Sequence, residues 1–292
     1  MTVHIGDAAS LRTVISSWIA EDTTSNEIVP IAVVALHACG DLTPSILKFL
    51  TTCKLDPPRR WHIVGAVVVG CCYNMMGLSS KLDCPRLSQC LDHPRDIQLS
   101  SSATTIGRKY GSLELSTQHL HLATQAPLTW SSDDSGSLSS ATSLSIRKVT
   151  YRALLSRRLD PAARAETGPP SLQEVHWTQK RVGRLASSAY RDFNCYLTLA
   201  AKRLQVGEAM LDTKTRMQPD ESDLQFTLET LYVLRCFIGP VIESYIALDR
   251  LLYLQEHLQG SNSNGSAYLC NLFDQGTGSL RNLALVWRPS DV

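Results

Sequence analysis

Two apolar runs near the start of the chain constrain its fold more than any other feature. They cover residues 31–36 and 62–70, and such runs are typical of strands buried on both faces of a parallel sheet. Between them, Thr43 can cap a helix and Pro44 suits the first helical position, so a helix is predicted at 45–53. A strand–helix–strand unit crosses over right-handed and places both strand ends at one edge of the sheet. The sequence therefore predicts an α/β fold.

The remaining segments extend this unit into a predicted three-part organisation. Residues 1–95 form the α/β core, with a further helix predicted from the apolar spacing at 11–20. Residues 96–145 are rich in serine and weakly apolar, so they are predicted to be a loop or a disordered insert. Residues 146–292 are predicted to add helices and a closing strand to the same domain. These elements are predicted at 146–159, 182–206, 224–258 and 283–287, with a break at Gly239-Pro240 in the longest helix.

Charge and composition exclude several classes of protein. The formal net charge of +1 gives no overall electrostatic attraction to nucleic acid or to a membrane. The longest apolar run, 63–72, is about half as long as a membrane span requires, so no membrane partner is expected. The chain begins without the basic-then-apolar pattern of a secretion signal. Its nine cysteines are an odd number, so reduced thiols and a cytoplasmic or nuclear location are predicted.

Polar and sulfur-containing side chains follow both predicted strands at the point where each strand ends. Ligands bind at the carboxyl ends of strands in open α/β sheets, so these side chains are predicted to line one crevice. Each of them also has a structural interpretation, because a cysteine after a strand often serves as a small apolar residue and Asp41 can cap a helix. The residues of this predicted crevice are His37, Cys39, Asp41, Cys71, Cys72, Tyr73 and Asn74.

One interpretation of four of these residues is that they bind zinc. His37, Cys39, Cys71 and Cys72 are ligand types that zinc accepts. Adjacent residues of a strand point to opposite faces, however, and the pattern lacks a CxxC pair. The sequence therefore predicts no metal site.

Basic residues form two further clusters, at 147–164 and 180–191. Basic residues of this kind usually lie on the solvent-exposed faces of helices, and the alternative is that they form a surface that binds nucleic acid. Tyr151, Trp177 and Tyr190 are the aromatic residues close enough in sequence to stack on bases. RNA, a protein side chain and a small molecule therefore all stay open as partners.

The two strand ends resemble a known family. Residues 34–42, Val-Ala-Leu-His-Ala-Cys-Gly-Asp-Leu, and 69–74, Val-Gly-Cys-Cys-Tyr-Asn, are similar to the methyltransferase-like protein 25 family. The resemblance implies part of a class I methyltransferase: a Rossmann-like, doubly wound sheet with additional C-terminal helices, using S-adenosylmethionine. Some members carry a ribosomal RNA adenine dimethylase label. Further similar segments lie at 151–155, 182–190, 240–244, 248–256, 272–274 and 279–286.

The resemblance also implies roles for particular residues. In class I methyltransferases the loop after the fourth strand meets the methyl acceptor, and this loop corresponds to residues 37–41 here. His37 would orient or deprotonate the acceptor, with Cys39 and Asp41 beside it. Asp7 and Ala8 resemble an acidic turn that binds the adenine of the cofactor, although a helix cap explains Asp7 equally well.

One departure from the family concerns the cofactor. The family's glycine-rich loop lies upstream of its His-Ala-Cys-Gly segment, and this chain has no such loop before His37. Gly276 and Gly278 follow a helix and precede a strand, which is the context of a turn. The resemblance therefore implies a chain that lacks the N-terminal cofactor-binding half and binds S-adenosylmethionine weakly or not at all. A non-catalytic binding or scaffold protein derived from a methyltransferase is the alternative.

Overall fold

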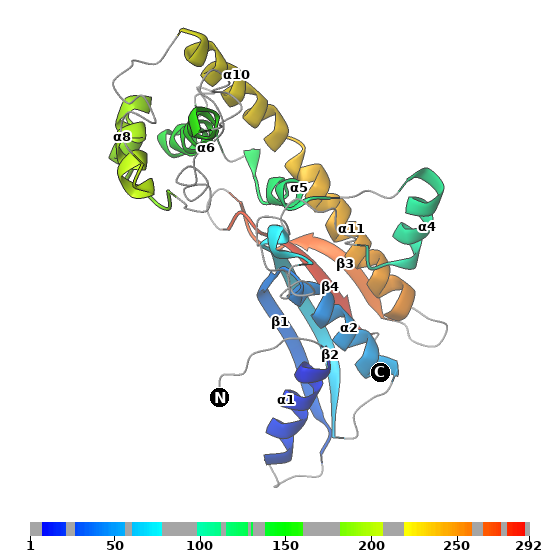
Figure 1. The fold of residues 1–292 in the computed structure, drawn as a ribbon. Helices are drawn as coiled ribbons and strands as arrows, with labels where there is room; N and C mark the ends of the chain where they lie inside the picture. Colours follow the sequence, from blue (N-terminus) through cyan, green and yellow to red (C-terminus); the bar gives the residue numbers. More distant parts are fainter. Residues whose placement is uncertain are drawn as a thin grey trace, which may run out of the picture. The chain divides into compact units, whose positions relative to one another are not determined.

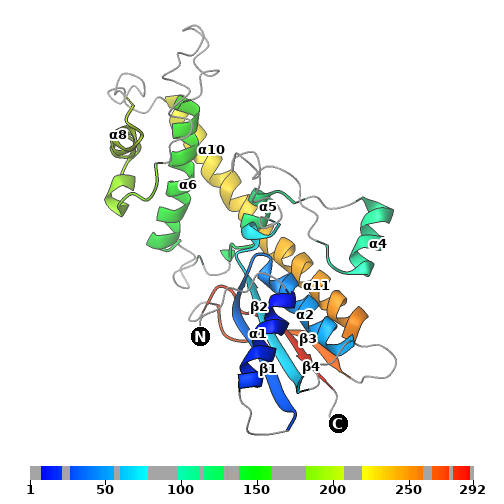
Figure 2. The same cartoon turned by 60° about the horizontal axis from the view of Figure 1, so that its bottom comes forward.

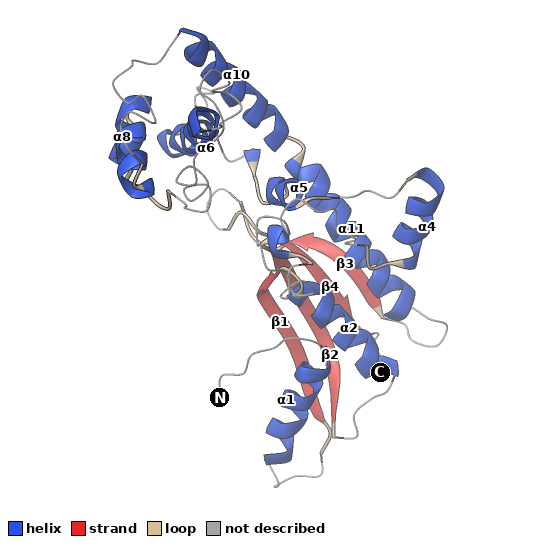
Figure 3. Ribbon diagram, viewed as in Figure 1, coloured by secondary structure: helices blue, strands red, loops and turns tan. Residues whose placement is uncertain are grey.

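The chain has an α/β structure in the computed structural model (Figures 1 and 3). The model describes residues 8–21, 27–55, 60–77, 98–111, 115–127, 130, 138–159, 182–206, 219–258, 265–275 and 279–289. Contacts divide the chain into two compact units: Met1–Pro127 with Cys236–Val292, and Leu128–Arg235. The prediction that residues 146–292 belong to one domain with the core therefore does not hold for the helices before Cys236.

A mixed four-stranded sheet organises the first unit, in the order β1-β2-β4-β3. Strand β1 (Val29–Cys39) pairs parallel with β2 (Trp61–Cys71), and both predicted apolar runs lie within these strands. Strand β4 (Leu283–Arg288) pairs antiparallel with both β2 and β3 (Ser266–Asn271). The predicted parallel pair and the predicted closing strand are both confirmed.

Three helices cover one face of this sheet (Figure 2). They are α1 (Ala8–Glu21), α2 (Leu42–Leu55) and α11 (Gly239–Leu258). The core between them and the sheet includes Phe49 of α2, whose ring stacks on Trp61 of β2 at 6.1 Å. Helix α2 begins earlier than predicted, so Thr43 lies inside its first turn and donates to the carbonyl of Ala38 at 2.8 Å instead of capping the helix.

The second face of the sheet is open among the described residues. Val34 and Leu36 of β1 are 65% and 49% exposed, and Tyr268 of β3 is 41% exposed. Only near the centre of this face are side chains buried, in a small cluster of Val69, Ala284 and Val286. The prediction that both runs are buried on two faces is therefore wrong for β1, because an apolar run does not show which of its faces other elements cover.

The predicted serine-rich loop contains helices where the structure describes it. Residues Ser101–Tyr110 form α4 and Thr117–Leu122 form α5, so the loop prediction is wrong for these residues. The Ser100 side chain caps α4 by accepting from the Ala103 amide at 3.0 Å, and Leu120 of α5 is fully buried. Serines that cap helices give a segment the same composition as serines that leave it disordered.

The described residues of the second unit form four helices. They are α6 (Ser140–Leu159), the 3-10 helix η5 (Ser187–Tyr190), α8 (Phe193–Leu204) and α10 (Pro219–Cys236). Their core is built around four buried aromatic rings, which form five contacting pairs with ring centres 5.2–6.4 Å apart. The helix predicted at 182–206 becomes a regular α-helix only at Phe193, because the Asp192 carboxylate caps it there by accepting from the Cys195 amide at 2.8 Å. The rings belong to Tyr151, Tyr190, Phe193 and Tyr196.

The break predicted at Gly239-Pro240 is confirmed, since α10 ends at Cys236 and α11 begins at Gly239. Gly239 packs so closely that a Cβ atom there would overlap the carbonyl oxygen of Leu122. The stretch Glu221–Leu258 is long and apolar enough to cross a membrane by length and composition alone. The sequence alone predicted no stretch of this kind. Buried core helices of soluble proteins pass the same test, although only 28% of this apolar window is buried.

Candidate functional site

The ends of β1 and β2 lie side by side, as predicted from the strand–helix–strand unit. In the parallel pair, Ala38 is opposite Gly70 and Cys39 is opposite Cys71. The Gly40 amide donates to the Cys71 carbonyl at 3.2 Å, which extends the pairing beyond the last strand residue. The residues that follow the two strands therefore share one edge of the sheet.

A tight turn after β1 is attached to the segment after β2. Gly40 has a φ of +52°, and a Cβ atom there would lie 2.9 Å from both Cβ and the carbonyl oxygen of Met75. Asp41 Oδ1 accepts from the Gly77 amide at 2.7 Å. In this structure the Asp41 carboxylate connects the two loops at the sheet edge, which is a positioning role.

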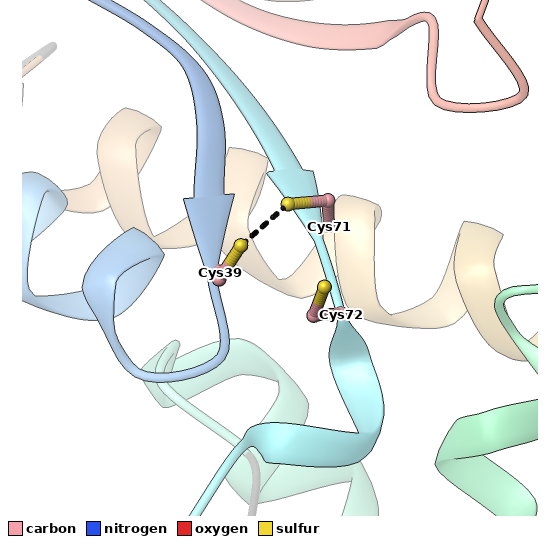
Figure 4. A group of neighbouring side chains, drawn as sticks. All are labelled: Cys39, Cys71 and Cys72. Atoms are coloured by element: carbon pink, nitrogen blue, oxygen red, sulfur yellow. Dashed lines mark hydrogen bonds between the residues drawn. The ribbon is translucent and has the colours of Figure 1, made fainter. Parts of the chain in front are cut away.

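Three thiols meet between these loops (Figure 4). The Sγ atoms of Cys39 and Cys71 are 3.0 Å apart, and the Sγ atoms of Cys39, Cys71 and Cys72 all lie within 4.8 Å of one another. Cys72 adopts a left-handed backbone, with φ 46° and ψ 47°, immediately after β2 ends. The prediction that the side chains of Cys71 and Cys72 point to opposite faces is therefore wrong. Side chains alternate in this way only while both residues belong to a strand, and β2 ends at Cys71.

The environment of these thiols favours their neutral form. Burial raises the pKa of Cys71 above the usual thiol range, and the Cys39 thiol raises it further. Burial and Cys39 also raise the pKa of Cys72, although the positive charge of Arg281 opposes this. The thiols of Cys71 and Cys72 are therefore protonated at neutral pH unless another positive charge replaces their protons.

A buried polar network lies beside the thiols. The Tyr73 hydroxyl donates to Glu243 Oε1 at 3.2 Å, and Arg281 Nη1 donates to the same oxygen at 3.0 Å and to the Ala123 carbonyl at 2.9 Å. Burial raises the pKa of Tyr73 beyond its usual range, and the Glu243 charge adds to this effect. Sequence reasoning placed Tyr73 in the site but missed Glu243 and Arg281, which lie in two of the family-like segments without any local signal that they pair.

The other predicted site residues lie apart from the thiol cluster or outside the described residues. His37 is exposed in β1, where the register shifts between Ala35 and Ala38. Asn74 is half-buried in the 3-10 helix η1 (Tyr73–Met75). Ala8 is the first residue of α1, and Asp7 lies outside the described residues.

The basic clusters of the second unit make contacts within the protein. Arg158 donates to both carboxylate oxygens of Glu221, at 2.7 and 2.6 Å, and Lys148 lies 5.6 Å from the centre of the Tyr190 ring. Tyr151 and Tyr190 are buried and stack on each other, so they do not offer free faces to nucleic-acid bases. Trp177 lies outside the described residues.

The sheet and the paired strand ends define an α/β protein compatible with a methyltransferase-like fold. The chain is 23% identical over 259 residues to "Probable methyltransferase-like protein 25" of Mus musculus. It is 24% identical over 251 residues to the Homo sapiens protein of the same name. These matches confirm the resemblance predicted from the two strand ends.

The matches cover most of this chain but a much smaller part of the mouse and human proteins. They include 85% and 83% of this chain but only 37% and 36% of the mouse and human proteins, so the chain spans little more than a third of their length. No family model and no solved structure matches the chain.

Proposed function

We propose that this chain takes part in methyl transfer from S-adenosylmethionine, with the shared edge of β1 and β2 facing the methyl acceptor. The observation that carries the proposal is the parallel register that brings residues 37–41 and 71–74 together. The carboxyl ends of parallel strands are where ligands bind in this fold class. The names of the mouse and human relatives supply the reaction type. The proposal includes a doubly wound, Rossmann-like sheet, of which the described strands are a part.

Each residue at this edge has a proposed role. His37 is exposed, so it can reach an acceptor and orient or deprotonate it. Asp41 and Gly40 hold the turn that directly follows Cys39, the last residue of β1. The segment Cys71 to Asn74 forms the opposite wall of the acceptor pocket. The sulfonium of S-adenosylmethionine is already activated as a leaving group, so positioning supplies most of the rate.

The proposal expects weak cofactor binding by these 292 residues. Asp7 and Ala8 are the proposed adenine-binding residues, and a charged hydrogen bond from the Asp7 carboxylate would contribute about 1.5–3 kcal/mol. Even millimolar affinity requires about 4 kcal/mol. Calorimetric titration with S-adenosylmethionine should therefore detect no micromolar binding. Micromolar binding would mean that the cofactor is held by residues not identified here.

A matched pair of histidine variants tests the function. The chain is incubated with millimolar, methyl-labelled S-adenosylmethionine and with total RNA or total protein from a cell extract. His37→Ala should reduce methyl transfer by about 10²–10⁴-fold, the usual contribution of a general base. His62→Ala is the control, because His62 is also exposed on β2 but lies near the other end of the strand.

The outcomes separate the proposal from its rival. Transfer that is lost in His37→Ala and kept in His62→Ala supports the proposal. Equal transfer by both variants contradicts the role of His37. An absence of transfer by the unmodified chain into either fraction favours a non-catalytic binding or scaffold protein.

A further inference from the structure

We infer that Cys39, Cys71 and Cys72 form a binding site for one thiophilic metal ion, with Zn²⁺ as the representative cation. The inference does not depend on methyl transfer, because metal binding is measured without S-adenosylmethionine or an acceptor. It rests on the positions of the three sulfur atoms, on the backbone of Cys72 and on the charge beside the cluster.

The sulfur positions fit a metal with thiolate ligands. A Zn–S bond of about 2.3 Å in a tetrahedral site separates the sulfurs by about 3.7 Å. The sulfurs here are 3.0 Å apart for Cys39 and Cys71, and no pair exceeds 4.8 Å. Movements of less than about 1.1 Å per pair therefore bring them to the tetrahedral spacing. Soft sulfur ligands select zinc and copper(I) over harder cations such as Mg²⁺.

The backbone of Cys72 is the second observation. A left-handed conformation is uncommon for a residue other than glycine and carries a conformational cost. Its effect is visible in Figure 4, where the Cys72 side chain lies on the same side as the sulfurs of Cys39 and Cys71. The unfavourable conformation thus brings a third thiol to a pair that already exists. Packing alone does not require a cysteine in this position.

Metal binding at the cluster releases the thiol protons to solvent. One divalent ion replaces the three thiol protons, forms three metal–sulfur bonds and leaves a complex with one negative charge. The positive charge of Arg281, which is paired with Glu243, also acts on Cys72 and favours a thiolate there. Because the protons must leave, binding strengthens as the pH rises. Three protein ligands would leave a fourth ligand position for water or a substrate, as in catalytic zinc sites.

Cobalt titration tests the site directly. The reduced chain is titrated with Co²⁺ without oxygen, and thiolate-to-cobalt absorption should reach its limit at one ion per chain and disappear when Zn²⁺ is added. Cys39→Ser, Cys71→Ser and Cys72→Ser should each weaken binding by more than about 100-fold, since even loss of an outer-shell partner costs 10–100-fold. Cys270→Ser is the control, because Cys270 is a half-buried free thiol on β3, outside the cluster.

A second measurement uses the unmodified chain, so it does not depend on whether the variants fold. Zn²⁺ should protect Cys39 and Cys72 from alkylation, read by mass spectrometry of peptides, and should leave Cys195 and Cys270 reactive. Absence of saturable cobalt absorption, or equal alkylation with and without Zn²⁺, overturns the inference. Oxidation of Cys39 and Cys71 to a disulfide, with no effect of metal on the reduced chain, overturns it as well.

Discussion

Two carboxylates of α11 hold the start of α4, and removing the more buried one should destabilise the first unit. Asp249 accepts hydrogen bonds from the amides of Leu99 and Ser100 and from the Ser100 hydroxyl, at 3.0–3.1 Å, and it also pairs with Arg250. Its side chain and that of Arg250 are only 2% and 3% exposed. Glu256 lies about two turns further along the same face of α11. It accepts from the Ser101 and Ser102 amides at 2.8 Å but is exposed.

The perturbation is Asp249→Asn, which keeps the shape and removes the charge. Its amide group would face donors where the carboxylate now accepts, and the buried guanidinium of Arg250 would lose its counter-charge. Breaking a buried pair by removing one partner costs about 3–5 kcal/mol. Because natural domains are stable by only about 5–15 kcal/mol, this is a large fraction of the total.

The assay is urea unfolding, followed by circular dichroism, together with hydrogen exchange of the α4 amides. Asp249→Asn should lower the free energy of unfolding by about 3–5 kcal/mol and should remove exchange protection from α4. Glu256→Gln is the matched control, since it removes an exposed carboxylate from the same helix start, and it should cost about 1 kcal/mol or less. Equal losses in the two variants, or a loss below 1 kcal/mol for Asp249→Asn, would refute the assignment of the buried pair.

The charge of Glu256 and the backbone of Gly40 give two further predictions. The hydrogen bonds from Ser102 and Ser101 outweigh burial, which acts in the opposite direction, and lower the pKa of Glu256 below its ordinary 4.5. Its stabilising contribution is therefore complete above that value and is lost as the pH falls through the lower, folded-state pKa. The α4 amides of wild type should therefore be better protected from exchange than those of Glu256→Gln above pH 4.5, and this difference should shrink as the pH falls below 4.5. Gly40→Ala should lower the free energy of unfolding in urea by about 1–3 kcal/mol, because Gly40 has a positive φ and contacts Met75. Gly111→Ala is the control: Gly111 also has a positive φ but lies in open space, so the free energy of unfolding should fall by less. A larger loss for Gly111→Ala than for Gly40→Ala would contradict the steric contribution of Met75.

The sequence was sufficient to predict the elements that depend on local apolar pattern. The strands β1 and β2, their parallel pairing and the helix break before Gly239 follow from runs, periodicity and one glycine–proline pair. Because parallel pairing fixes where two strands end, the meeting of Cys39 with Cys71 was also predictable. These inferences need no information about distant residues.

The features that the sequence did not reveal depend on contacts between distant residues or on backbone conformation. Helix α4 was missed because the residues at its start are bonded by residues some 150 positions later in the chain: Asp249 accepts from Ser100, and Glu256 accepts from Ser101 and Ser102. The pairing of Glu243 with Arg281 is equally non-local. The third thiol was missed because nothing in a Cys-Cys pair shows that the second residue turns left-handed.

The close approach of Gly239 to the carbonyl of Leu122 has a consequence for evolution. Any side chain at this position requires α5 to move away from α11, so substitution of this glycine is coupled to the placement of a whole helix. A descendant can lose Gly239 only after, or together with, a change in the segment around Leu122.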